Sequence, residues 1–141
     1  MARLYRNIKV YQLAYNFVLK VYNQTENFPK SEENNIKSQL RRAAVSIPLN
    51  IAEGSAKASK KEFLHYLNIA YGSAKEIEVL LSLCFDLNYF NSADYNLLSE
   101  NIDELNAKLF LFLRDVESKV LDRKSTFFRK FKNSQKFPQK L

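Results

Sequence analysis

The sequence predicts an all-α protein, folded as an antiparallel, up-down-up-down four-helix bundle. Apolar residues recur at alternating spacings of three and four in four long segments, which is the pattern of helices that pack side by side. The 141 residues include only two glycines and three prolines, too few for the turns that many short strands require. A hydrophobic content of 46% is enough for one continuous core.

The first two helices are predicted over residues 8–24 and 31–54. Asn7 is a suitable N-cap for the first helix, and Ser31, followed by two glutamates, is a suitable N-cap for the second. Gly54 is the expected end of the second helix. The apolar stripe of this helix continues through Pro48, and a proline there removes one backbone donor and crowds a carbonyl, so a kink is predicted at Pro48. The two stripes consist of Val10, Leu13, Ala14, Phe17, Val18 and Val21, and of Ile36, Leu40, Ala44, Ile47 and Ile51.

The third and fourth helices have equally regular patterns. Ser59-Lys60-Lys61-Glu62 has the sequence of a capping box, in which the Ser59 hydroxyl accepts a hydrogen bond from the Glu62 amide. Asn91-Ser92 is expected to form a turn and to cap the fourth helix. The stripes are Phe63, Leu67, Ala70, Ala74, Ile77, Leu81 and Cys84 in the third helix, and Tyr95, Leu98, Ile102, Leu105, Leu109, Phe112 and Val116 in the fourth.

Residues 109–113 of the fourth helix are apolar on every side. One four-helix core cannot cover all of them, because a helix in a bundle turns only one stripe inward. Phe110, Leu111 and Leu113 are therefore predicted to contact a second copy of the protein, although a tail folded back onto the helix would cover them too.

Composition and charge narrow the class of protein. Cys84 is the only cysteine, which rules out an intrachain disulfide and fits the reducing cytoplasm. No apolar run is long enough to span a membrane and the first residues do not resemble an export signal, so we expect a cytoplasmic protein without a membrane partner. Residues 1–121 hold 15 basic and 14 acidic residues, whereas residues 122–141 hold seven basic residues against Asp122 alone. We therefore divide the chain into a nearly neutral bundle, residues 1–121, and a basic aromatic tail, residues 122–141.

Four motifs of the chain resemble those of one known family. They are FP at residues 28–29, QLRRAA from Gln39, SIPLNIAEG from Ser46 and IAYGSAKEIE from Ile69. The stretch over residues 8–121 resembles the four-helix-bundle family first associated with intervening sequences in bacterial large-subunit ribosomal RNA genes. Tyr11 stands where that family usually has a tryptophan, and the tail lies outside the resemblance.

The resemblance implies a homopentameric ring of antiparallel bundles without recognised catalytic residues, and we expect no cofactor. It also implies a distant similarity to the accessory proteins of diversity-generating retroelements, which bind nucleic acid and a reverse transcriptase. The expected partners are therefore further copies of the chain, RNA or single-stranded nucleic acid, and a reverse transcriptase or another protein.

A polar stripe runs beside the apolar stripe of the second helix. It consists of Arg42, Ser46, Asn50 and Glu53, whose spacing places them on one helix face. One interpretation is a subunit interface in which Arg42 and Glu53 pair with residues of neighbouring chains, because a buried charge persists only when it is paired. The alternative is an ordinary solvated face, which every amphipathic helix has.

No catalytic or metal site is predicted. Glu62 and His65 match the Glu-x-x-His pair of di-iron bundles, but that site needs a second such pair and His65 is the only histidine. The capping box already accounts for Glu62. Helical ribonucleases that place an arginine four to six residues before a catalytic histidine do not match either, because residues 59–61 are serine and two lysines. A glycine-rich phosphate loop and a nucleophile elbow are also missing from the sequence, and we predict a non-enzyme.

The tail mixes basic and aromatic residues, as segments that bind single-stranded RNA do. Basic groups release counterions from phosphates, and aromatic rings stack on unpaired bases. The alternative is a solvated tail whose phenylalanines fold onto the fourth helix. The predicted RNA-binding residues are Arg123, Lys124, Phe128, Arg129, Lys130, Phe131 and Lys132 in the tail, together with Lys57, Lys60 and Lys61 between the second and third helices.

Two functions are consistent with these patterns. The first is an oligomeric RNA-binding protein or nucleoprotein accessory factor. The second is a protein-interaction scaffold that recruits a partner protein and has no physiological contact with RNA.

Overall fold

The computed structural model describes residues 4–134, and the side chains of all of these except residues 123–128 and 131–134. The elements in chain order are η1 (Tyr5–Asn7), α1 (Lys9–Thr25), η2 (Lys30–Glu32), α2 (Ile36–Ser55), α3 (Lys60–Asp86) and α4 (Ser92–Ser134), where η marks a 3-10 helix. Residues 4–134 contain no strand, which confirms the predicted all-α class.

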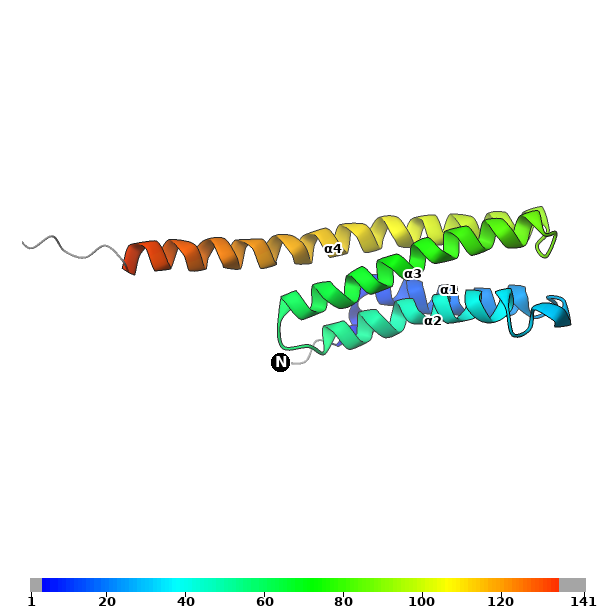
Figure 1. Cartoon of the computed structure of the whole chain (residues 1–141), viewed down its shortest axis with the longest axis horizontal. Helices are drawn as coiled ribbons and strands as arrows, with labels where there is room; N and C mark the ends of the chain where they lie inside the picture. The colour runs from blue at the N-terminus through cyan, green and yellow to red at the C-terminus, as the bar shows by residue number, and fades with distance from the viewer. Residues whose placement is uncertain (1–3, 135–141) are drawn as a thin grey trace, which may run out of the picture.

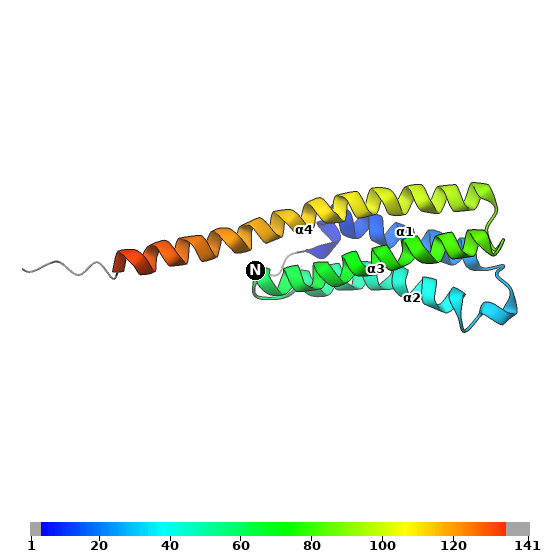
Figure 2. The same cartoon turned by 45° about the horizontal axis from the view of Figure 1, so that its top comes forward.

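The four α-helices lie side by side and alternate in direction (Figure 1). Each helix contacts its neighbour in the chain, and α1 also contacts α4, which closes the bundle. The α1–α2 and α3–α4 connections lie together at one end, which we call the loop end. The start of the chain and the α2–α3 turn lie at the opposite end, which we call the exit end because α4 leaves the bundle there (Figure 2).

The core consists of the side chains that the three-and-four spacing predicts. Every member of the predicted stripes of α2 and α3 is buried, and so are most members of the stripes of α1 and α4. Burying one such side chain stabilises the fold by roughly 1.5–3 kcal/mol. The largest side chains with almost no exposed surface are Leu40, Ile47, Ile51, Leu67, Ile77, Leu81, Leu98, Ile102, Leu105 and Leu109.

Two predicted helix caps are confirmed. Ser59 Oγ accepts a hydrogen bond from the Glu62 amide at 3.2 Å, and α3 begins directly afterwards. Asn91 Oδ1 accepts a hydrogen bond from the Asp94 amide at 2.7 Å at the start of α4. Both side chains satisfy backbone donors that have no partner inside the helix.

The predicted N-caps of the first two helices are wrong, although the first helix begins within one residue of its predicted start. Ser31 lies inside η2, and α2 begins only at Ile36. Glu32 Oε2 accepts a hydrogen bond from the Ile36 amide at 3.2 Å, so a carboxylate from the preceding turn caps α2 in place of Ser31. Asn7 lies inside η1, and Ile8, which offers no capping side chain, precedes α1.

Gly54 lies one residue before the end of α2, close to the predicted end of this helix. Its role is to let α2 and α3 approach each other. A Cβ atom at Gly54 would lie 2.6 Å from Tyr66 Cβ and 2.9 Å from Phe63 Cδ2, a separation that only glycine permits. Pro48 is buried inside α2, which continues through it.

α4 is much longer than the helices it packs against. It has 43 residues and α3 has 27, which at 1.5 Å per residue correspond to about 65 Å and about 40 Å. Val116 is the last buried side chain among residues 92–122, and beyond it the helix projects from the exit end (Figures 1 and 2). We call residues 117–134 the α4 extension. The boundary predicted between residues 121 and 122 falls inside this helix, whose backbone continues to Ser134.

Candidate functional site

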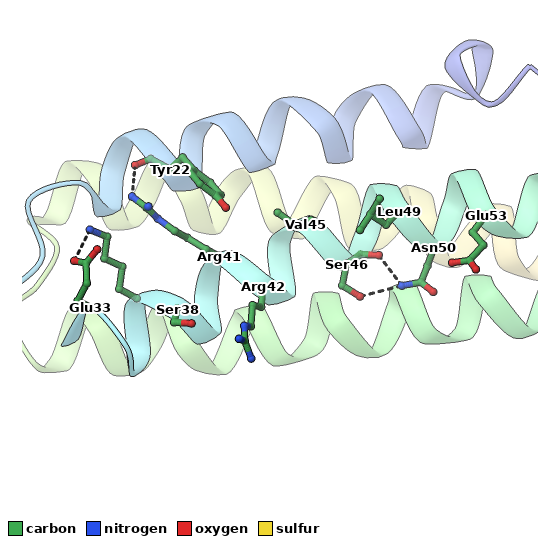
Figure 3. A pocket seen from close by; sticks show the side chains of 11 residues that line it. Tyr22, Glu33, Ser38, Arg41, Arg42, Val45, Ser46, Leu49, Asn50 and Glu53 are labelled. Carbon is green, nitrogen blue, oxygen red and sulfur yellow. Dashed lines mark hydrogen bonds and ion pairs between the residues drawn. The ribbon is translucent and has the colours of Figure 1, made fainter.

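An open groove of about 620 Å³ runs along the outer face of α2 (Figure 3). α1 contributes Tyr22 to its wall, and Val45 and Leu49 provide apolar surface within it. The groove contains all four residues of the predicted polar stripe, Arg42, Ser46, Asn50 and Glu53. The helical spacing therefore identified a surface that the folded chain does present together.

Hydrogen bonds in the middle of the groove join α2 to α3. Asn50 Nδ2 donates to the Ser46 carbonyl oxygen at 2.7 Å and to Ser46 Oγ at 2.9 Å (Figure 3). The Ser46 and Ser73 hydroxyl oxygens are 2.9 Å apart across the two helices. Because these half-buried groups satisfy one another, Ser46 and Asn50 have a structural role within one chain.

The two arginines of the QLRRAA motif have different surroundings. Arg41 Nε donates to Thr25 Oγ1 at 2.9 Å, and Arg41 Nη2 donates to the Tyr22 carbonyl oxygen at 3.1 Å. Since α1 ends at Thr25, Arg41 places a cation at the negative end of the α1 dipole. Arg42 is exposed and has no hydrogen-bond or ion-pair partner within the described part of the chain.

The charges along the groove divide into paired and unpaired groups. Lys37, which is only 7% exposed, pairs with Glu33 at 2.9 Å, and this contact lowers the pKa of Glu33. Among the described residues nothing pairs with Arg42 or with the exposed Glu53. The groove therefore presents one cation and one anion that are available to a second molecule.

The two ends of the bundle carry opposite charge. Residues 4–9 and 56–62, at the exit end, hold five basic residues against Glu62 alone. Residues 26–35 and 86–94, at the loop end, hold five acidic residues against Lys30 alone. The exit end is thus a positively charged surface and the loop end a negatively charged one.

The lysines predicted to bind RNA lie at the exit end. Lys57 and Lys61 are exposed and Lys60 is half-buried. Lys57 Nζ is 5.2 Å from the centre of the Tyr66 ring, which holds its charge beside the α2–α3 turn. These lysines belong to the same end of the molecule as the α4 extension.

The predicted residues of the tail belong to the helical backbone of α4. Arg129 and Lys130 are exposed on the α4 extension. The side chains of the remaining predicted residues lie outside the described ones, namely those of Arg123, Lys124, Phe128, Phe131 and Lys132. The fold brings the α4 extension and the turn lysines to one end because α4 leaves the bundle beside the α2–α3 turn.

The apolar turn of α4 is only partly exposed. Phe110 and Leu111 have 42% and 67% of their surface exposed, and the Phe110 ring lies 6.0 Å from that of Tyr71. Leu113 is only 7% exposed, because it belongs to the chain's own core. The prediction of Leu113 at a subunit interface assumes that its apolar surface is exposed. Because Leu113 is buried within its own chain, that assumption does not hold.

A second exposed apolar stripe, on the outer face of α3, is missing from the sequence-based predictions. Ile69, Val79 and Leu83 expose 41%, 61% and 46% of their surface. Gly72 lies between them, and a Cβ atom there would meet nothing within 4 Å. Ile69, Gly72, Glu76, Val79 and Leu83 alternate by three and four, so the signal was present in the sequence. The exposed Glu76 interrupts this apolar stripe, and the buried stripe of the same helix is stronger.

The remaining reactive side chains that the structure describes do not gather into a recognisable catalytic centre. The exposed His65 packs edge-on against Tyr66, with 5.5 Å between ring centres. Burial raises the pKa of the Cys84 thiol to about 12, so it stays protonated and a weak nucleophile at neutral pH. Within residues 4–134, His, Cys, Asp and Glu side chains do not gather in any cluster suited to a metal ion. The described helices also include none that is apolar over the length of a membrane crossing.

Comparisons with known proteins agree with this architecture. The chain is similar to a protein of unknown function from the S23 ribosomal protein family of Bacteroides thetaiotaomicron VPI-5482, whose crystal structure superimposes with a TM-score of 0.67. The two chains are 26% identical, and the match covers 74% of this chain and 97% of the other. No curated protein matches the sequence significantly. The model of the 23S rRNA-intervening sequence protein family matches residues 6–110, which include the α2 groove and end before the α4 extension. The chain therefore belongs to the 23S rRNA-intervening sequence protein family.

Proposed function

We propose that the chain is a non-enzymatic, homo-oligomeric protein of the cytoplasm that binds single-stranded RNA through its exit end and its α4 extension. The observation that carries this proposal is the separation of charge along the bundle, because residues 4–9 and 56–62 at the exit end hold five basic residues against Glu62 alone. Clustered cations attract a phosphate backbone and release the counterions condensed on it. The acidic loop end repels the same backbone, so RNA approaches from one end only.

The α4 extension enlarges this surface. It carries the exposed Arg129 and Lys130 away from the bundle on a continuous helix, where a strand can reach them without a clash with the rest of the chain. The family name, which refers to intervening sequences of 23S ribosomal RNA genes, is in keeping with an RNA ligand and does not identify one.

The salt dependence of RNA affinity tests the proposal. If the tail covers about six phosphates, the logarithm of the association constant for a labelled oligouridylate falls with the logarithm of salt concentration at a slope of about −4. A full-length variant in which the tail cations Arg123, Lys124, Arg129, Lys130 and Lys132 become glutamine should show a much flatter slope.

Lys75→Gln/Lys108→Gln is the matched control. Both lysines are exposed or half-exposed members of intrahelical ion pairs on the body of the bundle, so their loss should leave the slope unchanged. Affinity that ignores salt, or a slope that the tail variant leaves intact, contradicts the proposal.

We further propose that the oligomer is the five-membered ring that the family resemblance implies. Supporting observations are the exposed stripe on α3, the exposed Phe110 and Leu111 on α4, and the unpaired Arg42 and Glu53 in the α2 groove. A ring places several extensions on one strand and raises affinity through effective concentration. Native mass spectrometry should find five times the chain mass, whereas a single chain at micromolar concentration contradicts the ring.

The second candidate function is a scaffold that recruits a partner protein, such as a reverse transcriptase, without binding RNA. The exposure of Ile69, Val79 and Leu83 on one face of α3 favours it, because apolar surface of this kind marks protein contacts. Recovery of one dominant partner after nuclease treatment, with no affinity for oligouridylate, supports the scaffold over the RNA-binding protein.

A further inference from the structure

Three tyrosine rings form a ladder where η1 meets α1. The centres of the Tyr5 and Tyr11 rings are 5.0 Å apart in edge-to-face geometry, and those of Tyr11 and Tyr15 are 6.1 Å apart. Tyr15 exposes 51% of its surface, while Tyr5 and Tyr11 are half-buried. Gln12 Nε2 donates to the Arg6 carbonyl oxygen at 2.8 Å, which fastens η1 to α1 and holds the ladder in place.

The ladder is the shared wall of two hollows. One, of about 490 Å³, is the more polar of the two because Arg6, Gln12 and Asn16 complete its lining. The other, of about 380 Å³, is apolar and is closed by α2 through Val45, Pro48, Leu49 and Ala52, with Val18 and Leu19 from α1. Both hollows fall in the size range of ordinary small-molecule sites, and both are lined by the faces or edges of the tyrosine rings.

The polar hollow offers the groups that recognise an unpaired nucleotide. Tyrosine rings provide faces on which a base stacks, and the Asn16 side chain has both a donor and an acceptor for a base edge. Arg6 is exposed, and its guanidinium lies over the Tyr5 ring with its carbon 5.7 Å from the ring centre, so its charge is held at the Tyr5 end of the ladder. A phosphate next to a stacked base would find this cation within reach.

The position of the ladder agrees with this chemistry. η1 and the start of α1 lie at the exit end, together with the α2–α3 turn and the point where α4 leaves the bundle. The basic residues nearest in the chain, Arg6 and Lys9, belong to the positively charged set of this end. A strand held electrostatically at the exit end therefore passes close to the ladder.

We infer that Tyr5, Tyr11 and Tyr15 form a base-stacking platform for single-stranded RNA, with Arg6 on an adjoining phosphate. This inference rests on the proposed function and assigns the phosphates and the bases of the strand to different parts of the protein. The α4 extension and the turn lysines bind the phosphates of any strand, whereas the platform binds its bases. Removing the bases from a strand should therefore weaken binding, and removing the rings should abolish that difference.

The experiment compares a labelled oligouridylate of about 12 nucleotides with an abasic oligomer of the same length and phosphate number. The unaltered protein should bind the oligouridylate more tightly, by a factor of about 5 to 150 for each stacked base. Tyr5→Leu/Tyr15→Leu should bring the two affinities together and leave the salt slope unchanged. Tyr11 is kept because it packs against the core.

Tyr95→Leu is the matched control. Its ring stacks on Phe85 at the loop end, with 4.3 Å between centres, so its loss should change neither the base preference nor the slope. Circular dichroism establishes that each variant is folded. Tyr15→Leu alone, at the most exposed ring of the ladder, replaces the double variant if that variant does not fold, and it should reduce the preference.

The outcomes separate the two proposals. A base preference that disappears in the tyrosine variants, with the salt slope intact, supports the platform. A protein that binds both oligomers equally, or tyrosine variants that keep the preference, overturns the platform and leaves the proposed function standing. A protein that binds neither oligomer overturns both.

Discussion

Arg41 links the first two helices, α1 and α2, through side-chain hydrogen bonds. Besides its hydrogen bonds to Thr25 and to the Tyr22 carbonyl, its guanidinium lies over the Tyr22 ring, 4.3 Å from the ring centre. Thr25 is fully buried and its hydroxyl also donates to the Val21 carbonyl oxygen at 2.8 Å, so the contact closes the end of α1. The adjacent Arg42 takes no part in this cluster.

The two arginines should therefore respond differently to substitution. Arg41→Ala should lower the free energy of unfolding by about 1.5–3 kcal/mol, because hydrogen bonds from a charged group are lost and a buried hydroxyl oxygen loses its donor. Arg42→Ala should change it by less than about 0.5 kcal/mol, as at most exposed positions. Urea denaturation measures both values, and an equal loss in the two variants contradicts the assignment.

Arg42 also bears on the subunit interface. If its unpaired charge meets a neighbouring chain in the ring, Arg42→Ala should lower the oligomer mass measured by sedimentation while leaving the helical content unchanged. An unaltered mass favours the alternative of a solvated face for this end of the groove.

Among the helices, the two glycines show how close packing between helices and the intrinsic helix propensity of a residue oppose each other. Gly54 and Gly72 both lie inside helices, where replacing glycine by alanine stabilises the helix by up to about 1 kcal/mol. Gly54 has no room for a Cβ atom, whereas Gly72 faces open space. The same substitution therefore has opposite consequences at the two positions.

Gly72→Ala should raise the free energy of unfolding by up to about 1 kcal/mol. Gly54→Ala should lower it by about 1–3 kcal/mol, because Tyr66 and Phe63 must move and α2 must separate from α3. Thermal or urea denaturation of the two variants gives the comparison. Equal stabilisation by both alanines would show that α2 and α3 do not approach closely at Gly54.

The helices themselves could be predicted because burial follows the 3.6-residue period. The stripes of α2 and α3 are buried at every predicted position, and the caps at Ser59 and Asn91 form as expected. The start of α2 could not be predicted from Ser31, because the adjacent Glu32 supplies the group that caps the helix. The kink at Pro48 stays a prediction.

The end of α3 shows a further limit of sequence patterns. Tyr89 N donates to the Cys84 carbonyl oxygen at 2.8 Å and Asn88 N to that of Phe85 at 3.0 Å, which together form a Schellman motif. Asn88 adopts a left-handed φ of 63°, a conformation that asparagine tolerates better than most residues. No glycine marks this helix end, so the sequence carries only a weak signal for it.

For the whole molecule, the decisive feature is the opposite charge of the two ends. The basic residues of the exit end come from residues 4–9 and 56–62, which are far apart in the sequence. Only the antiparallel arrangement of α1, α2 and α3 brings them together. The lysines of the α2–α3 turn could be identified from the sequence, and the predicted antiparallel bundle already places that turn at the end where α4 leaves. The contribution of η1 and the start of α1 to this surface could not be predicted.

The reach of the basic surface follows from the same arrangement. The 18 residues of the α4 extension correspond to about 27 Å of helix beyond the last buried turn. In the proposed complex, an RNA strand that lies on the extension runs up to about 27 Å beyond the bundle, while the loop end stays outside the contact.

Mapping of RNA contacts by ultraviolet crosslinking and mass spectrometry tests the central claim most directly. With a photoreactive oligouridylate bound to the full chain, we predict crosslinks within residues 4–16 and 56–66, at the exit end, and within residues 117–134, the α4 extension. Residues 26–36 and 85–95, at the acidic loop end, should carry none. Crosslinks concentrated at the loop end, or spread evenly along the bundle, would contradict the account.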